Sequence, residues 1–195
     1  MYRVFETIKV VDGKPLNLFY HQKRIDWTFQ NYYKFVPFFS VEKISANLTF
    51  SDGINRLKII YDPSNVEIQI FPYNRKRVDY FYIVELDHLD YKFKYENRDI
   101  LEQYCTADYG EPIFLINGFI TDTTFSNLVF FDGQKWWTPS TYLLWGTKRE
   151  ALIDSNKIGV SEIRFSDLRY FEKFCLINSM NELDEFSFSI DSIRY

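Results

Sequence analysis

Residues 112–137, PIFLINGFITDTTFSNLVFFDGQKWW, contain two hairpin signals in succession. The first is Asn117-Gly118 and the second is Asp132-Gly133, and each dipeptide stands between short runs of apolar and aromatic residues. Asn-Gly and Asp-Gly favour the tight turns of antiparallel hairpins, because these residues accept positive φ values at low cost. Two consecutive hairpins predict an antiparallel sheet in the second half of the chain.

The regions on both sides of these hairpins contain a mixture of helix and strand patterns. They predict strands at residues 2–11, 56–61, 66–71, 80–86, 158–163 and 174–177, and helices at 18–33, 41–48, 97–104, 148–156 and 166–171. The expected fold class is therefore α/β in the α+β sense, with a sheet-rich C-terminal half.

A polar stretch near the middle of the chain predicts a connection between two domains. The length of 195 residues fits one large domain or two small ones. After Leu86 the sequence continues as Asp87-His88-Leu89-Asp90-Tyr91-Lys92, which lacks the apolar pattern of the preceding strand. We expect a small N-terminal α+β domain at residues 1–86, a connection at 87–93 and a larger domain at 94–195.

The composition is that of a folded globular protein. Hydrophobic residues make up 46% of the chain and the formal net charge is −4, which argues against disorder and against a nucleic-acid partner. Cys105 and Cys175 show no metal-ligand spacing, so no metal site is expected. The sequence has no run of about 18 apolar residues and no signal-peptide pattern, so we expect a cytoplasmic protein without a membrane span.

Lys94 is the candidate for covalent chemistry, and the residues alone leave two interpretations open. It follows Phe93 beside the polar connection and precedes the helix expected at 97–104. A lysine at this place is either a solvated surface amine or, where it faces a cleft, a group able to form a Schiff base. His21 and Arg24 are three residues apart, so they lie on one face of the helix expected at 18–33.

Several segments, in their order along the chain, resemble the class IV aminotransferases. These fold-type IV pyridoxal-phosphate enzymes include D-amino-acid aminotransferase, branched-chain aminotransferase and aminodeoxychorismate lyase. The segments are residues 5–13, His21-Gln22-Lys23-Arg24-Ile25, Lys94-Tyr95-Glu96-Asn97-Arg98, residues 120–128, Thr138-Pro139 and Gly146-Thr147-Lys148-Arg149. Each motif alone is common, whereas the whole ordered set, from Val4 to about Glu182, is not.

The resemblance implies a homodimer that binds pyridoxal 5′-phosphate in the cleft between two domains, with residues 94–195 as the cofactor-binding domain. It implies that Lys94 carries the cofactor and transfers protons, and that Asp122 contacts the ring nitrogen. The phosphate would be bound by Arg24, Ser179 and the amides of Thr147 and Lys148, and Asn127 belongs to the same cofactor site. Without the resemblance, the residues favour a turn-capping aspartate for Asp122 and a loop hydroxyl for Ser179.

Two kinds of function follow from the resemblance. The first is an enzyme that acts on a small amino substrate through a Lys94 Schiff base, either by elimination as in aminodeoxychorismate lyase or by transamination. The alternative is a catalytically degenerate homologue that serves as a binding or assembly module. The alternative is suggested by Asp122, which replaces the family's usual glutamate, and by an N-terminus that is short for the family.

Overall fold

The computed structural model describes residues 2–194, which form two compact units. The first unit comprises the chain up to Arg75 together with Phe93–Asn97, and the second comprises Lys76–Lys92 and the described residues from Arg98 onward. None of the described helices is long and apolar enough to cross a membrane.

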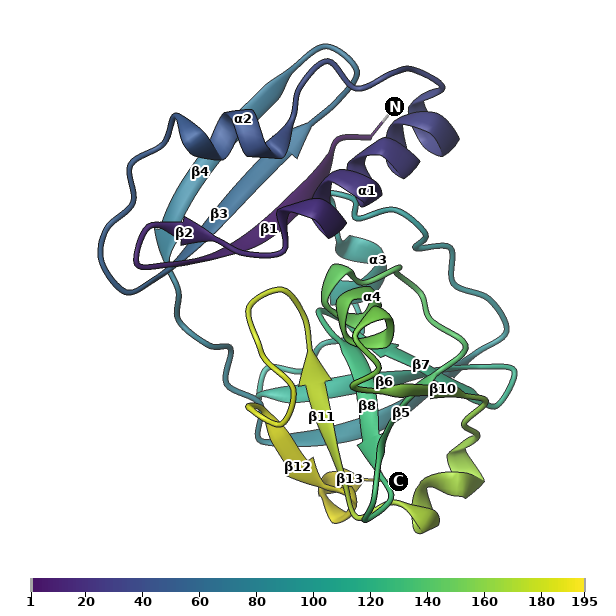
Figure 1. Cartoon of the computed structure of the whole chain (residues 1–195). Coiled ribbons are helices and arrows are strands. Elements are labelled where there is room, and N and C mark those ends of the chain that lie inside the picture. Colours follow the sequence, from purple (N-terminus) through teal and green to yellow (C-terminus); the bar gives the residue numbers. More distant parts are fainter. Residues whose placement is uncertain (1, 195) are drawn as a thin grey trace. The chain divides into compact units, whose positions relative to one another are not determined.

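The first unit is an antiparallel sheet with helices on one face (Figure 1). The strand order is β2-β1-β3-β4, with β1 at Val4–Val11, β2 at Lys14–Pro15, β3 at Ile54–Tyr61 and β4 at Val66–Pro72. The helices are α1 at Leu18–Thr28, its π-helical continuation η1 at Phe29–Tyr33, and α2 at Val41–Ala46. The helix predicted at 18–33 is therefore present, with its last turn widened.

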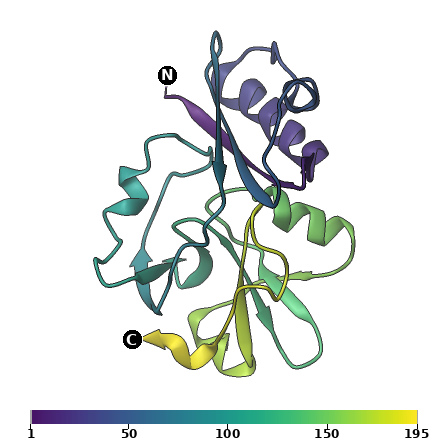
Figure 2. The same ribbon diagram turned by 90° about the vertical axis from the view of Figure 1, so that its left-hand side faces the viewer.

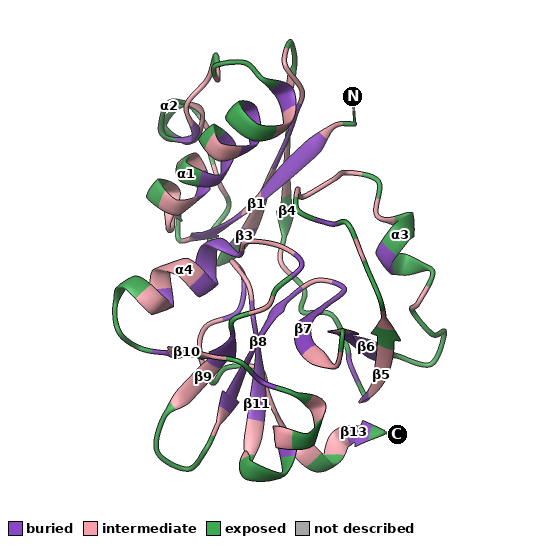
Figure 3. Ribbon diagram, turned by 90° about the vertical axis from the view of Figure 1, so that its right-hand side faces the viewer, coloured by how far each residue is buried: buried purple, intermediate pink, exposed green. Residues whose placement is uncertain are grey.

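Strand periodicity decides which residues of β1 face the helices. Successive side chains of a strand alternate between its faces, so Val4, Glu6, Ile8 and Val10 share one side. Ile8 lies in one apolar cluster with Ile25 of α1, which identifies this side as the helix-covered face. Buried segments of β1 and α1 are visible together in Figure 3. Glu6 is thus a charged residue directed into the layer between sheet and helix.

The second unit is built on a nine-stranded sheet. Figure 2 shows its C-terminal segments in yellow. Its main order is β10-β9-β8-β7-β6-β5-β13, and β11 pairs with both β8 and β12. The strands are β5 (Tyr80–Leu86), β6 (Gly110–Ile116), β7 (Phe119–Thr123), β8 (Asn127–Phe131), β9 (Trp136–Pro139), β10 (Gly159–Ser161), β11 (Lys173–Ile177), β12 (Ser187–Ser189) and β13 (Ile193–Arg194). The helices are α3 (Asp99–Glu102) and α4 (Thr147–Asp154), with 3-10 turns η2 (Phe165–Tyr170) and η3 (Ile190–Ser192).

Both hairpins predicted from residues 112–137 are present, because β6 pairs antiparallel with β7 and β8 with β9. The sheet is nevertheless mixed, since β5 runs parallel to β6 and β9 runs parallel to β10. The pairing with β6 also places β5 in the second unit. The structure therefore divides after Arg75, whereas the sequence-based boundary was expected at 87–93.

Candidate functional site

The predicted site residues fall into two groups, one in each unit. Arg24 and Lys94 belong to the first unit, and the second unit contains Asp122, Asn127, Thr147, Lys148 and Ser179.

Lys94 is fixed beside the beginning of β1 through its own backbone. Its carbonyl oxygen accepts a hydrogen bond from the Phe5 backbone N–H at 2.9 Å, and Val4 forms a bridge with Tyr95. The segment Phe93–Asn97 therefore packs with the first unit, although most of the neighbouring chain belongs to the second. The Lys94 amine lies 4.7 Å from the centroid of the Phe5 ring, and the residue is half-buried. Lys94 is thus held in a sheltered position against an aromatic face.

Arg24 lies in a buried cluster with Glu6 and His21. Its Nε donates to Glu6 Oε1 at 2.8 Å and its second terminal nitrogen donates to Oε2 at 2.5 Å. His21 Nδ1 lies 2.6 Å from the same Oε2 atom. The Glu6 and His21 side chains are 1% and 0% exposed, and that of Arg24 is 6% exposed. The helix spacing that puts His21 and Arg24 on one face therefore directs both at a single carboxylate.

The charges in this cluster follow from its contacts. Burial raises the pKa of Glu6, but the Arg24 charge and the hydrogen bonds from His21 and Arg24 outweigh it and lower that pKa to about 2. Burial is also the main cause that lowers the pKa of His21, and the charges of Arg24 and Lys94 act in the same direction. An ionised Glu6 can only accept, so His21 Nδ1 is the donor. His21 Nε2 has no hydrogen-bond partner among the described residues.

In the second unit, Asp122 is buried and receives three hydrogen bonds. Asn127 donates to Oδ1 at 2.8 Å, and the backbone N–H groups of Leu143 and Leu144 each donate to Oδ2 at 2.9 Å. Burial raises the pKa of Asp122 to about 6, although these bonds and the charge of Arg149 oppose the shift. Oδ1 has a single donor, which leaves it able to accept another.

Asn127 connects Asp122 to the start of α4. Its side-chain amide also donates to the Leu144 carbonyl at 3.0 Å. Its Oδ1 lies only 1.7 Å from where a β-carbon on Gly146 would be, so the residue at this position has to be glycine for Asn127 to remain in place. Gly146 precedes the first turn of α4 and offers no side-chain cap. The first amides of α4 therefore lack both an intrahelical acceptor and a capping side chain, which favours an anion.

Ser179 and Lys148 lie near the same end of the sheet. Ile177, the last residue of β11, pairs with Asn127, and Ser179 follows two residues later. The second unit thus gathers Asp122, Asn127, the start of α4 and the Ser179 turn. The Lys148 side chain pairs with Glu182, which leaves only its backbone amide for the predicted contact at the start of the helix.

Further charged residues support this end of the second unit. Glu111 is fully buried and accepts from the Thr124 backbone N–H at 2.7 Å, the Thr124 hydroxyl at 2.5 Å and the Lys76 amine at 2.7 Å. Arg98 donates to the Thr124 carbonyl. Glu111 and Arg98 thus both bind Thr124, which lies in the short connection between Asp122 and Asn127.

Glu6, Glu111 and the Arg149 side chain have no role predicted from the sequence. Arg149 is buried, donates to the Pro139 carbonyl at 2.9 Å and contributes positive charge near Asp122. A charged residue within an otherwise apolar strand was the available signal for Glu6 and Glu111, because such residues are buried only when paired. Their partners, however, are distant in sequence.

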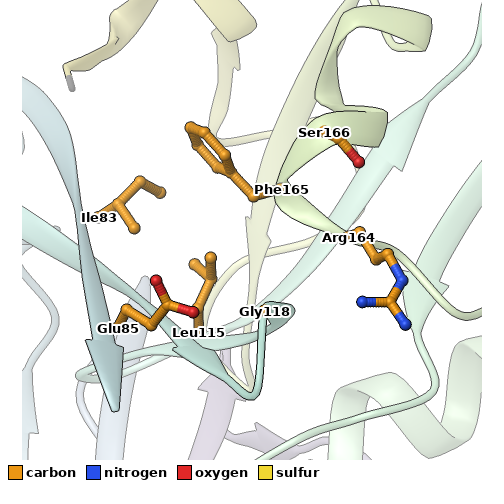
Figure 4. A pocket seen from close by; sticks show the side chains of 7 residues that line it. All are labelled: Ile83, Glu85, Leu115, Gly118, Arg164, Phe165 and Ser166. Atoms are coloured by element: carbon orange, nitrogen blue, oxygen red, sulfur yellow. The ribbon is translucent and has the colours of Figure 1, made fainter.

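A separate open groove lies in the second unit (Figure 4). It has a volume of about 470 Å³ and is lined by Ile83, Glu85, Leu115, Gly118, Arg164, Phe165 and Ser166. None of the predicted site residues lines it.

Comparisons with known proteins identify the family of this chain. The family model for amino-transferase class IV matches residues 95–183. An uncharacterized protein of Haemophilus influenzae is 34% identical over 94% of this chain and 100% of its own length. The crystal structure of a candidate 4-amino-4-deoxychorismate lyase of Haemophilus somnus is also 34% identical, with a TM-score of 0.83, and covers 94% of this chain and 98% of its own. The chain therefore belongs to the class IV aminotransferase family.

A more distant structure shares the fold. The pyridoxal-phosphate-bound form of a hypothetical aminotransferase from Mycobacterium tuberculosis has a TM-score of 0.70 at 15% identity and covers 98% of this chain and 81% of its own. At this level the likeness concerns the fold alone.

Proposed function

We propose that this protein is a pyridoxal 5′-phosphate-dependent enzyme that acts on a small amino substrate through Lys94. The observation that carries the proposal is the presence, in one compact unit, of a sheltered amine at Lys94 and a buried guanidinium at Arg24. Membership of the class IV aminotransferase family supports a reaction of this type. We further propose a cytoplasmic homodimer, in which residues 94–195 provide most of the cofactor contacts.

The residues present fit the chemistry of the cofactor. A phosphate ester requires positive charge and N–H donors, and the Arg24 guanidinium, oriented by two hydrogen bonds to Glu6, is a group of this kind. The amides at the start of α4 provide donors of the same kind, without a capping side chain in competition. A pyridinium nitrogen requires an acceptor, and Asp122 Oδ1 retains that capacity. When bound, pyridoxal phosphate stabilises the electrons released at the α-carbon of an amino substrate.

Each residue of the chain then has a defined task. Lys94 would hold the cofactor through its amine and, once that amine is released, would accept and return a proton at its Nζ atom. Arg24, Ser179 and the amides of Thr147 and Lys148 hold the phosphate. Asp122 Oδ1 would accept a hydrogen bond from the protonated ring nitrogen, and Asn127 holds Asp122 in position. The overall reaction is either an elimination, as in aminodeoxychorismate lyase, or a transamination.

Covalent trapping tests this proposal. The purified protein is incubated with pyridoxal phosphate, reduced with borohydride, digested and mapped by mass spectrometry. We expect the pyridoxyl group on Lys94, with Lys92 as the internal control because it is exposed and two residues away. Specific labelling of Lys92 would overturn the assignment of Lys94, and the absence of any specific label would overturn the enzyme proposal.

A second candidate function is a degenerate homologue that binds or assembles without catalysis. The observation in its favour is Asp122, which is shorter than the family's glutamate and already receives three hydrogen bonds. A visible absorbance spectrum, followed by a panel of amino substrates, separates the two functions. The enzyme gives a coloured complex whose spectrum changes with its substrate, whereas the degenerate homologue shows no such change.

A further inference from the structure

Glu6 is a deeply buried carboxylate of the first unit, and no role has been assigned to it. Its side chain is 1% exposed, and its two oxygens receive three donors: Arg24 twice and His21 once. Its place on the helix-covered face of β1 excludes it from solvent. A carboxylate in such a place is stabilised only by its partners, and it orients them in return.

We propose that Glu6 is a positioning residue, which fixes the guanidinium fork of Arg24 for an anionic ligand and fixes His21 in the tautomer with hydrogen on Nδ1. The identity of the anion as the phosphate of pyridoxal phosphate rests on the proposed function. The orientation of Arg24 and the tautomer of His21 do not depend on it.

The geometry accepts only a carboxylate of this length. Glu6 Oε1 accepts from Arg24 Nε, and Oε2 accepts from a terminal nitrogen of Arg24 and from His21 Nδ1. A glutamine at this position would, in either orientation of its amide, place its NH₂ group opposite one of the two Arg24 donors, and two donors cannot form a hydrogen bond. Aspartate keeps the charge but is shorter by one C–C bond of about 1.5 Å, so it cannot reach both donors without movement of β1.

The same contacts determine the state of His21. Glu6 is ionised and accepts hydrogen bonds, so Nδ1 carries hydrogen. The pKa of His21 is lowered, mainly by burial and further by the charges of Arg24 and Lys94, so the ring is neutral near pH 7. Nε2 is then a bare acceptor, and it has no partner among the described residues. The cluster therefore offers Arg24 as an oriented donor and His21 as an oriented acceptor.

The first experiment uses the ligand-free protein. Long-range ¹H–¹⁵N correlation spectra distinguish the two neutral tautomers of histidine and the cation, and His88 serves as an exposed internal reference. We expect His21 to be neutral with hydrogen on Nδ1, and Glu6→Gln to shift it toward the Nε2–H tautomer. A His21 that carries hydrogen on Nε2 in the unaltered protein would overturn the inference without any variant.

The second experiment compares pyridoxal phosphate with pyridoxal, which lacks the phosphate. We expect Arg24→Ala, Glu6→Gln and Glu6→Asp each to weaken pyridoxal phosphate binding by about ten- to a hundredfold and to leave pyridoxal binding unchanged. The double variant Glu6→Gln/Arg24→Ala should lose no more than Arg24→Ala alone, because Glu6 acts through Arg24. Glu67→Gln is the matched control, since Glu67 also pairs with an arginine, Arg3, but at the surface.

The outcomes separate this inference from the proposed function. Weakening by Arg24→Ala but not by either Glu6 variant would leave the proposed function intact and refute the positioning role. Circular dichroism of Glu6→Asp identifies any loss of fold. If the unaltered protein binds no pyridoxal phosphate, the proposed function is overturned, and the His21 tautomer decides alone whether Glu6 positions the cluster.

Discussion

Asn127 donates a hydrogen bond from its side-chain amide to Asp122 across 2.8 Å. The other end of the same amide group fills the space beside Gly146, immediately before α4. One asparagine therefore links the acid proposed for the ring nitrogen to the helix start proposed for the phosphate. Because both ends of the cofactor would contact this part of the second unit, a small shift of Asn127 would alter both contacts.

Gly146→Ala should disrupt this link. The new β-carbon would lie 1.7 Å from Asn127 Oδ1, closer than any real contact, so Asn127 has to move. We expect pyridoxal phosphate affinity to fall by about tenfold or more, because Asp122 loses a hydrogen bond and the helix start is displaced. Absorbance or fluorescence titration measures the change.

A double-mutant cycle provides the control for this substitution. Asn127→Ala removes the group that the new β-carbon would strike, so Gly146→Ala should cost little more when added to Asn127→Ala. If Gly146→Ala costs as much affinity in the Asn127→Ala background as in the unaltered protein, Gly146 acts independently of Asn127.

The pKa of Asp122 predicts a pH dependence of stability in the ligand-free protein. Burial raises this pKa from 3.8 to about 6, so between these values the folded state binds more protons than the unfolded state. The free energy of unfolding therefore falls as pH rises from about 4 to about 6, and the contribution of Asp122 is lost above that range. The shift of about two units corresponds to about 3 kcal/mol.

Asp122→Asn isolates this contribution, since asparagine does not titrate. Urea denaturation of both proteins between pH 4 and pH 7 gives the difference in unfolding free energy at each pH. We expect the unaltered protein to lose stability relative to the variant as pH rises. A difference that is constant over this range would contradict a raised pKa at Asp122.

Local sequence signals were sufficient for most of the fold. Asn117-Gly118 and Asp132-Gly133 predicted hairpins because their turn preference is a property of a few adjacent residues. The parallel pairing of β5 with β6 was not predicted, since it joins residues separated by α3 and its flanking loops. The short strands β12 and β13 were also missed, because two or three residues carry no measurable periodicity.

The candidate site was predicted unevenly for a similar reason. The family motifs led to Arg24, Lys94 and Asp122 as individual positions, and their roles stay predictions. Glu6 and Glu111 escaped attention because their function depends on partners 18 and 13 residues away, respectively, which no local pattern reveals. A buried carboxylate becomes recognisable only when its donors are known.

Glu111 should contribute to stability through the Thr124 connection. Glu111→Ala leaves two donors of Thr124 without an acceptor, and each buried group of this kind costs about 1–3 kcal/mol. Lys76→Met should cost less than Glu111→Ala, because it removes one half-exposed donor and leaves Glu111 bonded to Thr124. Urea denaturation measures both, and equal losses would contradict the assignment of the stabilisation to Thr124.

The phosphate contact proposed for the start of α4 can be tested by removing a single N–H group. Thr147 is the first residue of α4, a position where proline is well tolerated, and Gly146 has the extended conformation (φ −82°, ψ 129°) that a residue before proline prefers. Thr147→Pro should therefore keep the helix and delete the amide. Thr147→Ala is the matched control, since it removes the hydroxyl and retains the amide.

A hydrogen bond to a charged group contributes about 1.5–3 kcal/mol, so Thr147→Pro should bind pyridoxal phosphate about ten- to a hundredfold more weakly than Thr147→Ala. Pyridoxal, which has no phosphate, should bind the two variants equally. This difference between the two ligands separates loss of the phosphate contact from a general distortion of the site, which would weaken both. Equal affinity of the two variants for pyridoxal phosphate would show that the Thr147 amide does not contact the phosphate, and the anion would then depend on Arg24, Ser179 and the Lys148 amide.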